Sequence, residues 1–216
     1  MDYGKDFQIE KEYIEAIFTL GGLSECGKTT AGIRLETLPL GIKRYKIIDI
    51  EKEMMIARGY DISLGLSDKH FLALYQEKTE EVFKEFVMRL ITHLKEKGTT
   101  RVSLESLYRA PLGEFLKREF GEKCSNIYIE APIELRARRE YLKKCMESAG
   151  TKESCILYEL VLDSVKKKDE FKIQHNALEC KQIADYVIEN DENMDMRKFL
   201  SEIDRIALET IYGTHD

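Results

Sequence analysis

The sequence predicts an α/β fold, in which a five-stranded parallel sheet carries helices on both faces. Two observations lead to this prediction. Short apolar, partly β-branched runs recur along the chain, and amphipathic or charged helical segments separate them. The 216 residues include only 3 Pro, and neither an internal repeat nor a low-complexity tract divides them. We therefore expect residues 1–216 to form a single domain.

The apolar runs are short and are bounded by turn residues, as buried parallel strands are. Gly21-Gly22 ends the first run, Ala131-Pro132 follows the fourth, and Glu189-Asn190 closes the fifth. Strands are therefore expected at residues 16–20, 45–50, 102–107, 126–129 and 186–188.

The segments between the strands have helical periodicity. The clearest is 77–97, where Val82, Phe86, Leu90 and their apolar neighbours recur at three- and four-residue spacing before Gly98. Other helices are expected from Lys28 to near residue 39, over 51–56, in the charged stretch after Pro132, and over 196–211.

Composition limits the classes of partner. A net charge of −6 provides no general basic field, so neither nucleic acid nor an anionic membrane is an expected partner. No run approaches the roughly 20 apolar residues of a membrane span, and the polar N-terminus lacks an apolar signal core. A cytoplasmic location is expected. Five Cys without a C-x-x-C pair indicate neither a disulfide framework nor a zinc knuckle.

One motif carries specific chemistry. Residues 22–29 match G-x-x-x-x-G-K-[ST] and lie between an apolar strand and a helix. The glycines let the backbone wrap a polyphosphate so that N–H groups point inward, while Lys28 reaches the β- and γ-phosphates and Thr29 ligates Mg²⁺. The motif therefore predicts a site for ATP and Mg²⁺. Its expected cofactor-binding residues are Gly22, Leu23, Ser24, Glu25, Cys26, Gly27, Lys28, Thr29 and Thr30.

Phosphate-binding loops of this kind occur in GTPases, in motor and transport ATPases, and in kinases. No [NT]-K-x-D guanine-reading sequence occurs in the chain, which disfavours a GTPase. A chain of 216 residues without a long accessory module disfavours a motor or transporter subunit. Small-molecule kinases remain.

The sequence resembles the P-loop small-molecule kinases that include nucleoside monophosphate kinases and dephospho-coenzyme A kinases. The resemblance rests on the loop, on residues 128–139 with Pro132 and Arg139, and on 184–190, which resembles a closing A-D-x-V-I-x-N strand. It implies a P-loop NTPase fold with a helical lid at about 136–169, in which Arg139 screens the developing charge. It also places Asp49 toward the acceptor hydroxyl and sets Asn190 near an adenine edge.

Two acids have alternative interpretations. Asp49, at an expected strand end, is either an acceptor-orienting acid or general base, or a cap of the helix that follows. Glu105 lies in an apolar strand, where a buried carboxylate needs a partner. Glu105 is either near Mg²⁺ as a catalytic and metal-site residue, or in a salt bridge to a neighbouring Lys.

The basic residues are also open to more than one interpretation. Arg109, after the third strand, either binds a substrate phosphate or is a solvated loop residue. Arg136, Arg138 and Arg139 cannot all share one helix face. Arg139 alone matches the resemblance, so Arg136 and Arg138 are interpreted as surface residues. Lys143 shares the face of Arg139 and could act with it, whereas 166–168 is interpreted as a solvated face.

The expected function is ATP-dependent phosphorylation of a nucleotide-like small molecule, either dephospho-coenzyme A or a nucleoside monophosphate. In this mechanism Lys28, Asp49, Glu105 and Arg139 are the catalytic candidates. Two alternatives remain: a kinase of an unphosphorylated metabolite such as a nucleoside or sugar acid, and a non-catalytic ATP-binding regulator. The sequence identifies neither the acceptor nor the oligomeric state.

Overall fold

A computed structural model describes residues 3–63, 65, 67–75, 79–148 and 157–213. Its centre is a five-stranded sheet in the order β2-β3-β1-β4-β5, with every neighbouring pair parallel. The strands are β1 Ala16–Gly21, β2 Ile42–Lys46, β3 Arg101–Leu107, β4 Cys124–Glu130 and β5 Tyr186–Glu189. The parallel sheet and its five strands confirm the predicted fold class.

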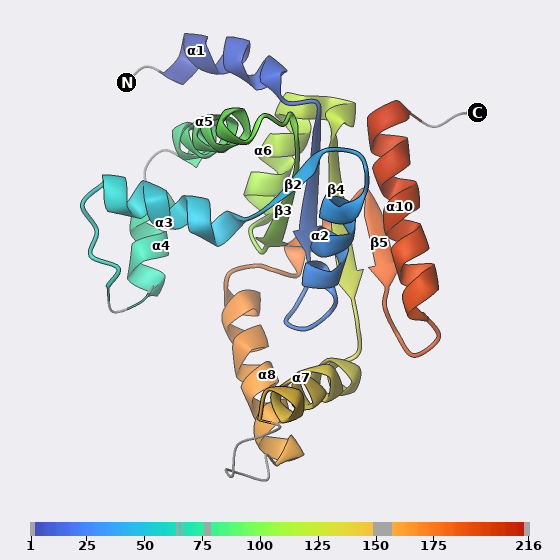
Figure 1. Ribbon diagram of the computed structural model, residues 1–216. Helices are drawn as coiled ribbons and strands as arrows, with labels where there is room; N and C mark the ends of the chain where they lie inside the picture. Colours follow the sequence, from blue (N-terminus) through green and yellow to red (C-terminus); the bar gives the residue numbers. More distant parts are fainter. Residues whose placement is uncertain (1–2, 64, 66, 76–78, 149–156, 214–216) are drawn as a thin grey trace.

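Helices cover both faces of the sheet (Figure 1). One face carries α1 Tyr3–Glu10, α3 Ile47–Ala57, α4 Asp68–Tyr75, α5 Thr79–Lys97 and α6 Ala110–Phe120. The other face carries α2 Lys28–Thr37 and α10 Met196–Tyr212. The remaining described elements are α7 Ile133–Ser148, α8 Tyr158–Gln174, α9 Glu179–Gln182 and the 3-10 turns Lys11–Tyr13 and Gly121–Lys123.

The central strand β1 shows why the sheet needs two helical layers. All of its residues are buried, and its side chains alternate between the two faces. Ile17 belongs to the core beneath α5 and α6, whereas Phe18 and Leu20 belong to the core beneath α2 and α10. A strand that is buried on both faces has apolar residues at successive positions, and residues 16–20 show this pattern.

The second strand differs from the expected one. β2 ends at Lys46, and α3 begins at Ile47, so residues 47–50 are helical rather than extended. Ile47, Ile50 and Met54 recur at three- and four-residue spacing and are buried in the core. Packing of this face outweighs the β-branched character of the run. The predicted placement of Asp49 at a strand end is therefore wrong.

The helix α6 is an addition to the expected elements. Its first turn contains Pro111, and it buries Leu112, Phe115, Leu116 and Phe120 against the core. This face closes the core between β3 and β4. Its apolar residues have a helical period, which the sequence shows but which our expected elements did not include.

The carboxyl ends of the strands face the α7–α8 pair, whereas the chain termini lie at the opposite end of the molecule (Figure 1). Ligands of open α/β sheets bind at the carboxyl edge. The sequence Ser148-Ala149-Gly150-Thr151 predicts a hinge or turn within the lid, and residues 149–151 lie outside the described part of the chain. Among the described helices, none is long and apolar enough to cross a membrane.

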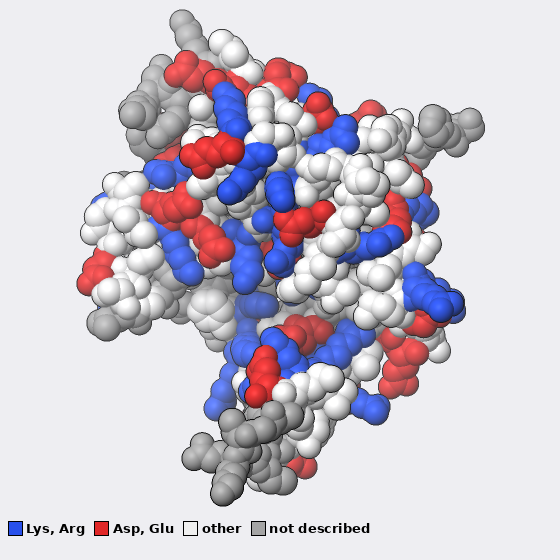
Figure 2. All heavy atoms as spheres, viewed as in Figure 1, with Lys and Arg blue, Asp and Glu red and all other residues white. Residues whose placement is uncertain are grey.

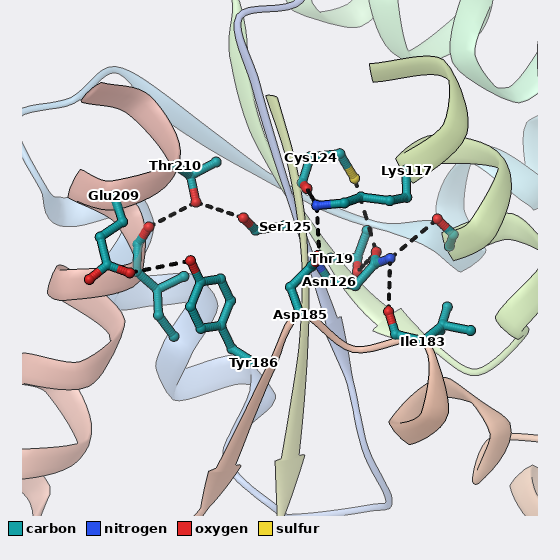
Figure 3. Close-up of polar contacts among 12 residues, drawn as sticks. Thr19, Lys117, Cys124, Ser125, Asn126, Ile183, Asp185, Tyr186, Glu209 and Thr210 are labelled. Carbon is teal, nitrogen blue, oxygen red and sulfur yellow. Dashed lines mark hydrogen bonds and ion pairs between the residues drawn. The ribbon is translucent and has the colours of Figure 1, made fainter. Parts of the chain in front are cut away.

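A buried polar cluster around Asn126 fixes β5 beside β4 (Figure 3). The Asn126 side chain accepts a hydrogen bond from Thr19 Oγ1 at 2.7 Å and donates to the carbonyls of Gly113 and Ile183. Its backbone N–H donates to Asp185, which also forms an ion pair with Lys117 at 2.8 Å. Asp185, the Asp of the A-D-x-V-I-x-N segment, is therefore a structural residue. The same cluster fixes the position of β5, which leads to Asn190.

Candidate active site

The phosphate-binding loop runs from the end of β1 to the first turn of α2. Gly22 and Gly27 have φ values of +127° and +121°, which side chains rarely adopt. A Cβ at Gly22 would lie 2.2 Å from the Ile129 carbonyl oxygen, and one at Gly27 would lie 2.7 Å from Asn190 Nδ2. The two glycines of the motif are therefore required by close approach as well as by backbone conformation.

Lys28 lies along the loop that precedes it. Its Nζ donates to the carbonyl oxygens of Gly22 at 2.9 Å and Leu23 at 2.5 Å, and Cys26 Sγ is 3.5 Å away. The residue is only 7% exposed, yet it lines a cavity. Its hydrogen-bond acceptors are neutral, so its positive charge remains available to an anion in that cavity.

The cavity lies between the loop and the α7–α8 pair and has a volume of about 1130 Å³. Two carboxylates, Glu25 and Asp163, line it. The cations that line it outnumber them, and they are Lys28, Arg139, Lys143, Lys167, Lys168 and Lys172. Figure 2 shows Lys and Arg side chains gathered where the α7–α8 pair meets the body of the molecule. A protein of net charge −6 thus has a basic cavity.

Glu105 lies beside Thr29, as the sequence predicts for residues that share the carboxyl edge. The Thr29 hydroxyl donates to Glu105 Oε2 at 3.3 Å, and Arg44 forms an ion pair with Glu105 Oε1 at 2.8 Å. The carboxylate is 1% exposed, and a Cβ at Gly32 would lie 2.3 Å from its Oε1. Gly32 therefore gives this carboxylate room to approach α2.

The Thr29 hydroxyl and the Glu105 carboxylate fit a Mg²⁺ ion. Both are hard oxygen donors, and Mg²⁺ usually takes one or two protein ligands and keeps water and substrate phosphate for the rest. The described residues contain no group of three or more His, Cys, Asp or Glu that could hold a metal by themselves. The donor set therefore suits a magnesium ion that arrives with a polyphosphate.

Arg139, from α7, reaches the phosphate-binding loop as the resemblance implies. Its guanidinium donates to the carbonyls of Glu25 and Cys26 at 3.5 and 3.4 Å, and to Asn190 Oδ1 at 3.0 Å. Partial burial lowers the pKa of Arg139 from its usual value. Asn190 in turn donates to the Cys26 carbonyl at 2.8 Å. Lys143 lies one turn further along α7 and also lines the cavity.

Asp49 is not part of this arrangement. Its side chain is 59% exposed in the first turn of α3, 3.6 Å from Lys52 Nζ, and it does not line the cavity. The buried acidic residue of α3 is Glu51, two residues after Asp49. The structure thus gives Asp49 no contact with the reaction site.

Arg109 does not line this cavity either. It forms a 2.6 Å ion pair with Glu51 and lies within 4.6 Å of the ring centroids of Phe71, Tyr75 and Tyr108. Burial raises the pKa of both tyrosines, so they remain neutral. The interpretation of Arg109 as a solvated loop residue is therefore wrong. Its binding of a substrate phosphate stays a prediction, and Arg109 does not line the cavity described above.

Arg136 corrects another interpretation, because it is 4% exposed rather than on the surface. It donates to Asp169 Oδ2 at 2.6 Å and to the Ser24 carbonyl at 3.0 Å, while Asp169 Oδ1 accepts from the Ser24 N–H at 3.0 Å. This Arg136–Asp169 pair joins α7 and α8 to the loop. Buried Val161 and Val165 precede Asp169 at four-residue spacing, which is a signal that sequence reasoning missed. Arg138 is exposed, as expected.

The lysines of α8 are the other contribution that sequence reasoning missed. Residues 166–168 are exposed as interpreted, yet Lys167 and Lys168 also line the cavity. Lys172, which received no role from the sequence, lines it as well. Of the nine expected cofactor-binding residues, those that line the cavity are Ser24, Glu25, Gly27, Lys28, Thr29 and Thr30.

No known protein family and no curated protein matches the chain. Solved structures are similar to it. An uncharacterized protein from Eubacterium ventriosum has 14% identity and a TM-score of 0.55, over 89% of this chain and 98% of that one. TT1252 from Thermus thermophilus has 19% identity and a TM-score of 0.52, over 93% and 100% of the two chains.

A shikimate kinase from Acinetobacter baumannii, solved with shikimate, has 16% identity over 97% of this chain and 99% of that one, with a TM-score of only 0.46. No comparison confirms the resemblance to nucleoside monophosphate kinases or dephospho-coenzyme A kinases. At these identities the similarities concern the fold alone. They show that the chain shares its parallel α/β fold with these solved structures. In this chain the loop between β1 and α2 carries the G-x-x-x-x-G-K-[ST] sequence, and a helical pair lies at the carboxyl edge of the sheet (Figure 1).

Proposed function

We propose that the chain is a kinase that transfers the γ-phosphoryl group of ATP to a small metabolite. The observation that carries this proposal is the basic cavity, which opens directly onto the phosphate-binding loop and is covered by α7 and α8. Phosphoryl transfer requires alignment and charge neutralisation more than covalent chemistry. A cavity with several cations beside a polyphosphate cradle supplies both.

The residues divide the work as follows. The loop N–H groups and the N-terminus of α2 bind the donor phosphates, and Lys28 exchanges its carbonyl partners for β- and γ-phosphate oxygens. Thr29 and the neighbouring Glu105 would hold Mg²⁺, which would supply neutralisation of negative charge. Arg139 already lies at the loop and screens charge that develops on the transferred group.

An anionic acceptor fits the cavity best, because four lysines of α7 and α8 line it in addition to Lys28 and Arg139. Dephospho-coenzyme A and nucleoside monophosphates both belong to this class, and so do carboxylated metabolites. Asp49 and Arg109 have no part in acceptor binding in this proposal, because neither lines the cavity.

The experiment is a screen of small metabolites with ATP and Mg²⁺, read as ADP formation and as phosphorylated product. Lys28→Met is the matched variant, because it removes the charge and keeps an unbranched side chain. We expect the variant to keep its fold and to lose several kcal/mol of transition-state stabilisation, at least a 100-fold loss of rate. Transfer within about threefold of wild type in Lys28→Met would refute the mechanism. Tight ATP binding without transfer to any acceptor would instead favour the regulatory alternative.

A further inference from the structure

Lys172 differs from the other lysines of α8 in its surroundings. It is partly buried and lines the cavity. Lys168, by contrast, is exposed and donates to Glu140 at 3.1 Å. Within the described part of the chain, the Lys172 ammonium has no hydrogen-bond or ion-pair partner. A partly buried ammonium without a partner is costly, so a ligand is the natural source of the missing acceptor.

The position of Lys172 is fixed by its neighbour one turn earlier. Asp169 is 4% exposed and accepts from the Ser24 N–H of the phosphate-binding loop at 3.0 Å. Arg136 holds the other oxygen of the same carboxylate. Residues three apart lie on the same face of a helix, so Lys172 is on the face of α8 that meets the loop.

The electrostatics place Lys172 near Lys28. Burial lowers the pKa of Lys172 to about 8, and the positive charge of Lys28 is the second cause of the decrease. Cys26, Asp169 and Glu25 partly offset this decrease. Two cations from different elements, Lys28 of α2 and Lys172 of α8, therefore line the same cavity. An anion between them would relieve their repulsion, provide an acceptor for Lys172, and replace neutral acceptors of Lys28 with charged ones.

We propose that Lys172 is a second phosphate-binding cation, which contacts the γ-phosphoryl group of the donor from the side opposite Lys28, and that Asp169 is its positioning residue. The proposal rests on the function proposed above. The γ-phosphoryl is the assigned partner because Lys28 reaches the β- and γ-phosphates, and Lys172 of α8 lines the same cavity as Lys28 of α2.

The test compares the binding of ADP with that of a non-hydrolysable ATP analogue at pH 7 and constant ionic strength. Four proteins are titrated: wild type, Lys172→Met, Lys172→Arg and Lys166→Met. Lys166 is exposed on the same helix, lies outside the cavity lining and serves as the matched control. We expect Lys172→Met to weaken analogue binding about 10- to 100-fold, and ADP binding much less. Lys172→Arg should recover most of the loss, and Lys166→Met should stay within about twofold of wild type.

Affinity for the analogue measured over a range of pH separates the effect of the Lys172 charge from the effect of the side chain's shape. Wild-type affinity for the analogue should fall between pH 7 and 9, as free Lys172 loses its proton, whereas Lys172→Arg should not show this part of the fall. Binding is measured without transfer, so absence of any kinase activity would refute the proposed function without deciding this test. Equal losses for ADP and the analogue, or analogue binding by Lys172→Met like that of wild type, would overturn the role of Lys172.

Discussion

The basic residues of this protein fall into two groups according to their partners. Arg44, Arg109 and Arg136 each form an ion pair with a buried carboxylate, so their charges are neutralised within the fold. Lys28 and Arg139 donate to carbonyl and amide oxygens. Neutral acceptors leave a net positive charge, which is what a phosphate site requires. The partner, rather than the residue type, thus separates structural cations from those that can bind a ligand.

One prediction at this scale concerns the stability of Lys172→Met. The folded protein lowers the pKa of Lys172 from 10.5 to about 8, so the charged form is disfavoured by folding. Below pH 8 this cost is fully present, and it disappears as pH rises toward 10.5. At pH 7 the variant should therefore be more stable than wild type by on the order of 2–3 kcal/mol.

Urea unfolding at pH 7 and pH 10 measures this difference. The gap between the two proteins should narrow at the higher pH, because the wild-type lysine then loses its charge in the folded state. Lys166→Met should change stability by less than about 0.5 kcal/mol, as expected of an exposed side chain. A variant that is less stable than wild type at pH 7 would show that the ammonium has a partner in the folded state.

A second prediction at this scale concerns Gly32→Ala. Alanine favours a helix interior over glycine by about 0.5–1 kcal/mol, so the change alone would stabilise α2. Here the new Cβ would lie 2.3 Å from Glu105 Oε1, and the carboxylate beside Thr29 must move. We expect the Mg²⁺ concentration needed for half-maximal binding of the ATP analogue to rise about tenfold. Ile33→Ala, at the exposed next position of α2, is the control, and an unchanged Mg²⁺ requirement in Gly32→Ala would exclude Glu105 from the metal site.

At the scale of elements, α7 and α8 meet the loop at one defined place. The Arg136–Asp169 pair is buried and forms hydrogen bonds to both backbone groups of Ser24. Asp169 accepts from the Ser24 N–H, and Arg136 donates to the Ser24 carbonyl. Removing one partner of such a pair costs about 3–5 kcal/mol, because the other charge is left buried. The lid over 136–169 stays a prediction. We expect its base at Arg136 and Asp169 to remain fixed and its closure to come from the described parts of α7 and α8 beyond this pair.

Hydrogen exchange with and without the ATP analogue tests this division. Amides near Arg136 and Asp169 should be protected in both states. Protection should rise on ligand binding in the phosphate-binding loop and in residues 140–148 and 158–166, where Lys143 and Asp163 face the cavity. Asp169→Asn, which removes the charge of the pair, should lower the protection of the base without ligand. A rise that is equal across the whole of 136–169 would mean that the base also moves.

At the scale of the whole molecule, the sheet order brings the functional segments together. β1 lies between β3 and β4, so the loop after β1 is flanked by the segments that follow those two strands. One of these is the end of β3, with Glu105, and the other leads through Pro132 into α7. In a protein of net charge −6, the basic cavity at the carboxyl edge is a local site that attracts an anion.

The expectation that residues 1–216 form a single domain stays a prediction, and calorimetry tests it. We expect one unfolding transition, because α7 and α8 are joined to the loop by a buried ion pair. Tripolyphosphate at 100 times its dissociation constant should stabilise the whole chain by about 2.7 kcal/mol and raise its Tm. Lys28→Met should show a much smaller rise. Two transitions, of which tripolyphosphate shifts only one, would instead divide the chain into two units.

The sequence by itself determined the sheet, the loop and the long helices, because each is encoded locally. Apolar runs such as 16–20 identify strands, the spacing of Val82 and Phe86 identifies α5, and the eight residues of the loop carry their own chemistry. Thr29 and Glu105 were also placed together correctly, since parallel strand ends share one edge. These inferences need only short-range patterns and one topological rule.

Only the tertiary structure decided which charged residues face the cavity. Asp49 does not line the cavity, because packing of Ile47 and Ile50 makes residues 47–50 part of α3. Arg109 forms an ion pair with Glu51 and does not line the cavity either. Lys172 lines the cavity because Asp169, one turn earlier on α8, accepts a hydrogen bond from the Ser24 N–H. Ser24 is 145 residues away from Asp169 in the sequence. A local pattern contains no information about such a partner. The charge of a lysine or arginine is written in the sequence, but whether that charge is neutralised depends on contacts that only folding creates.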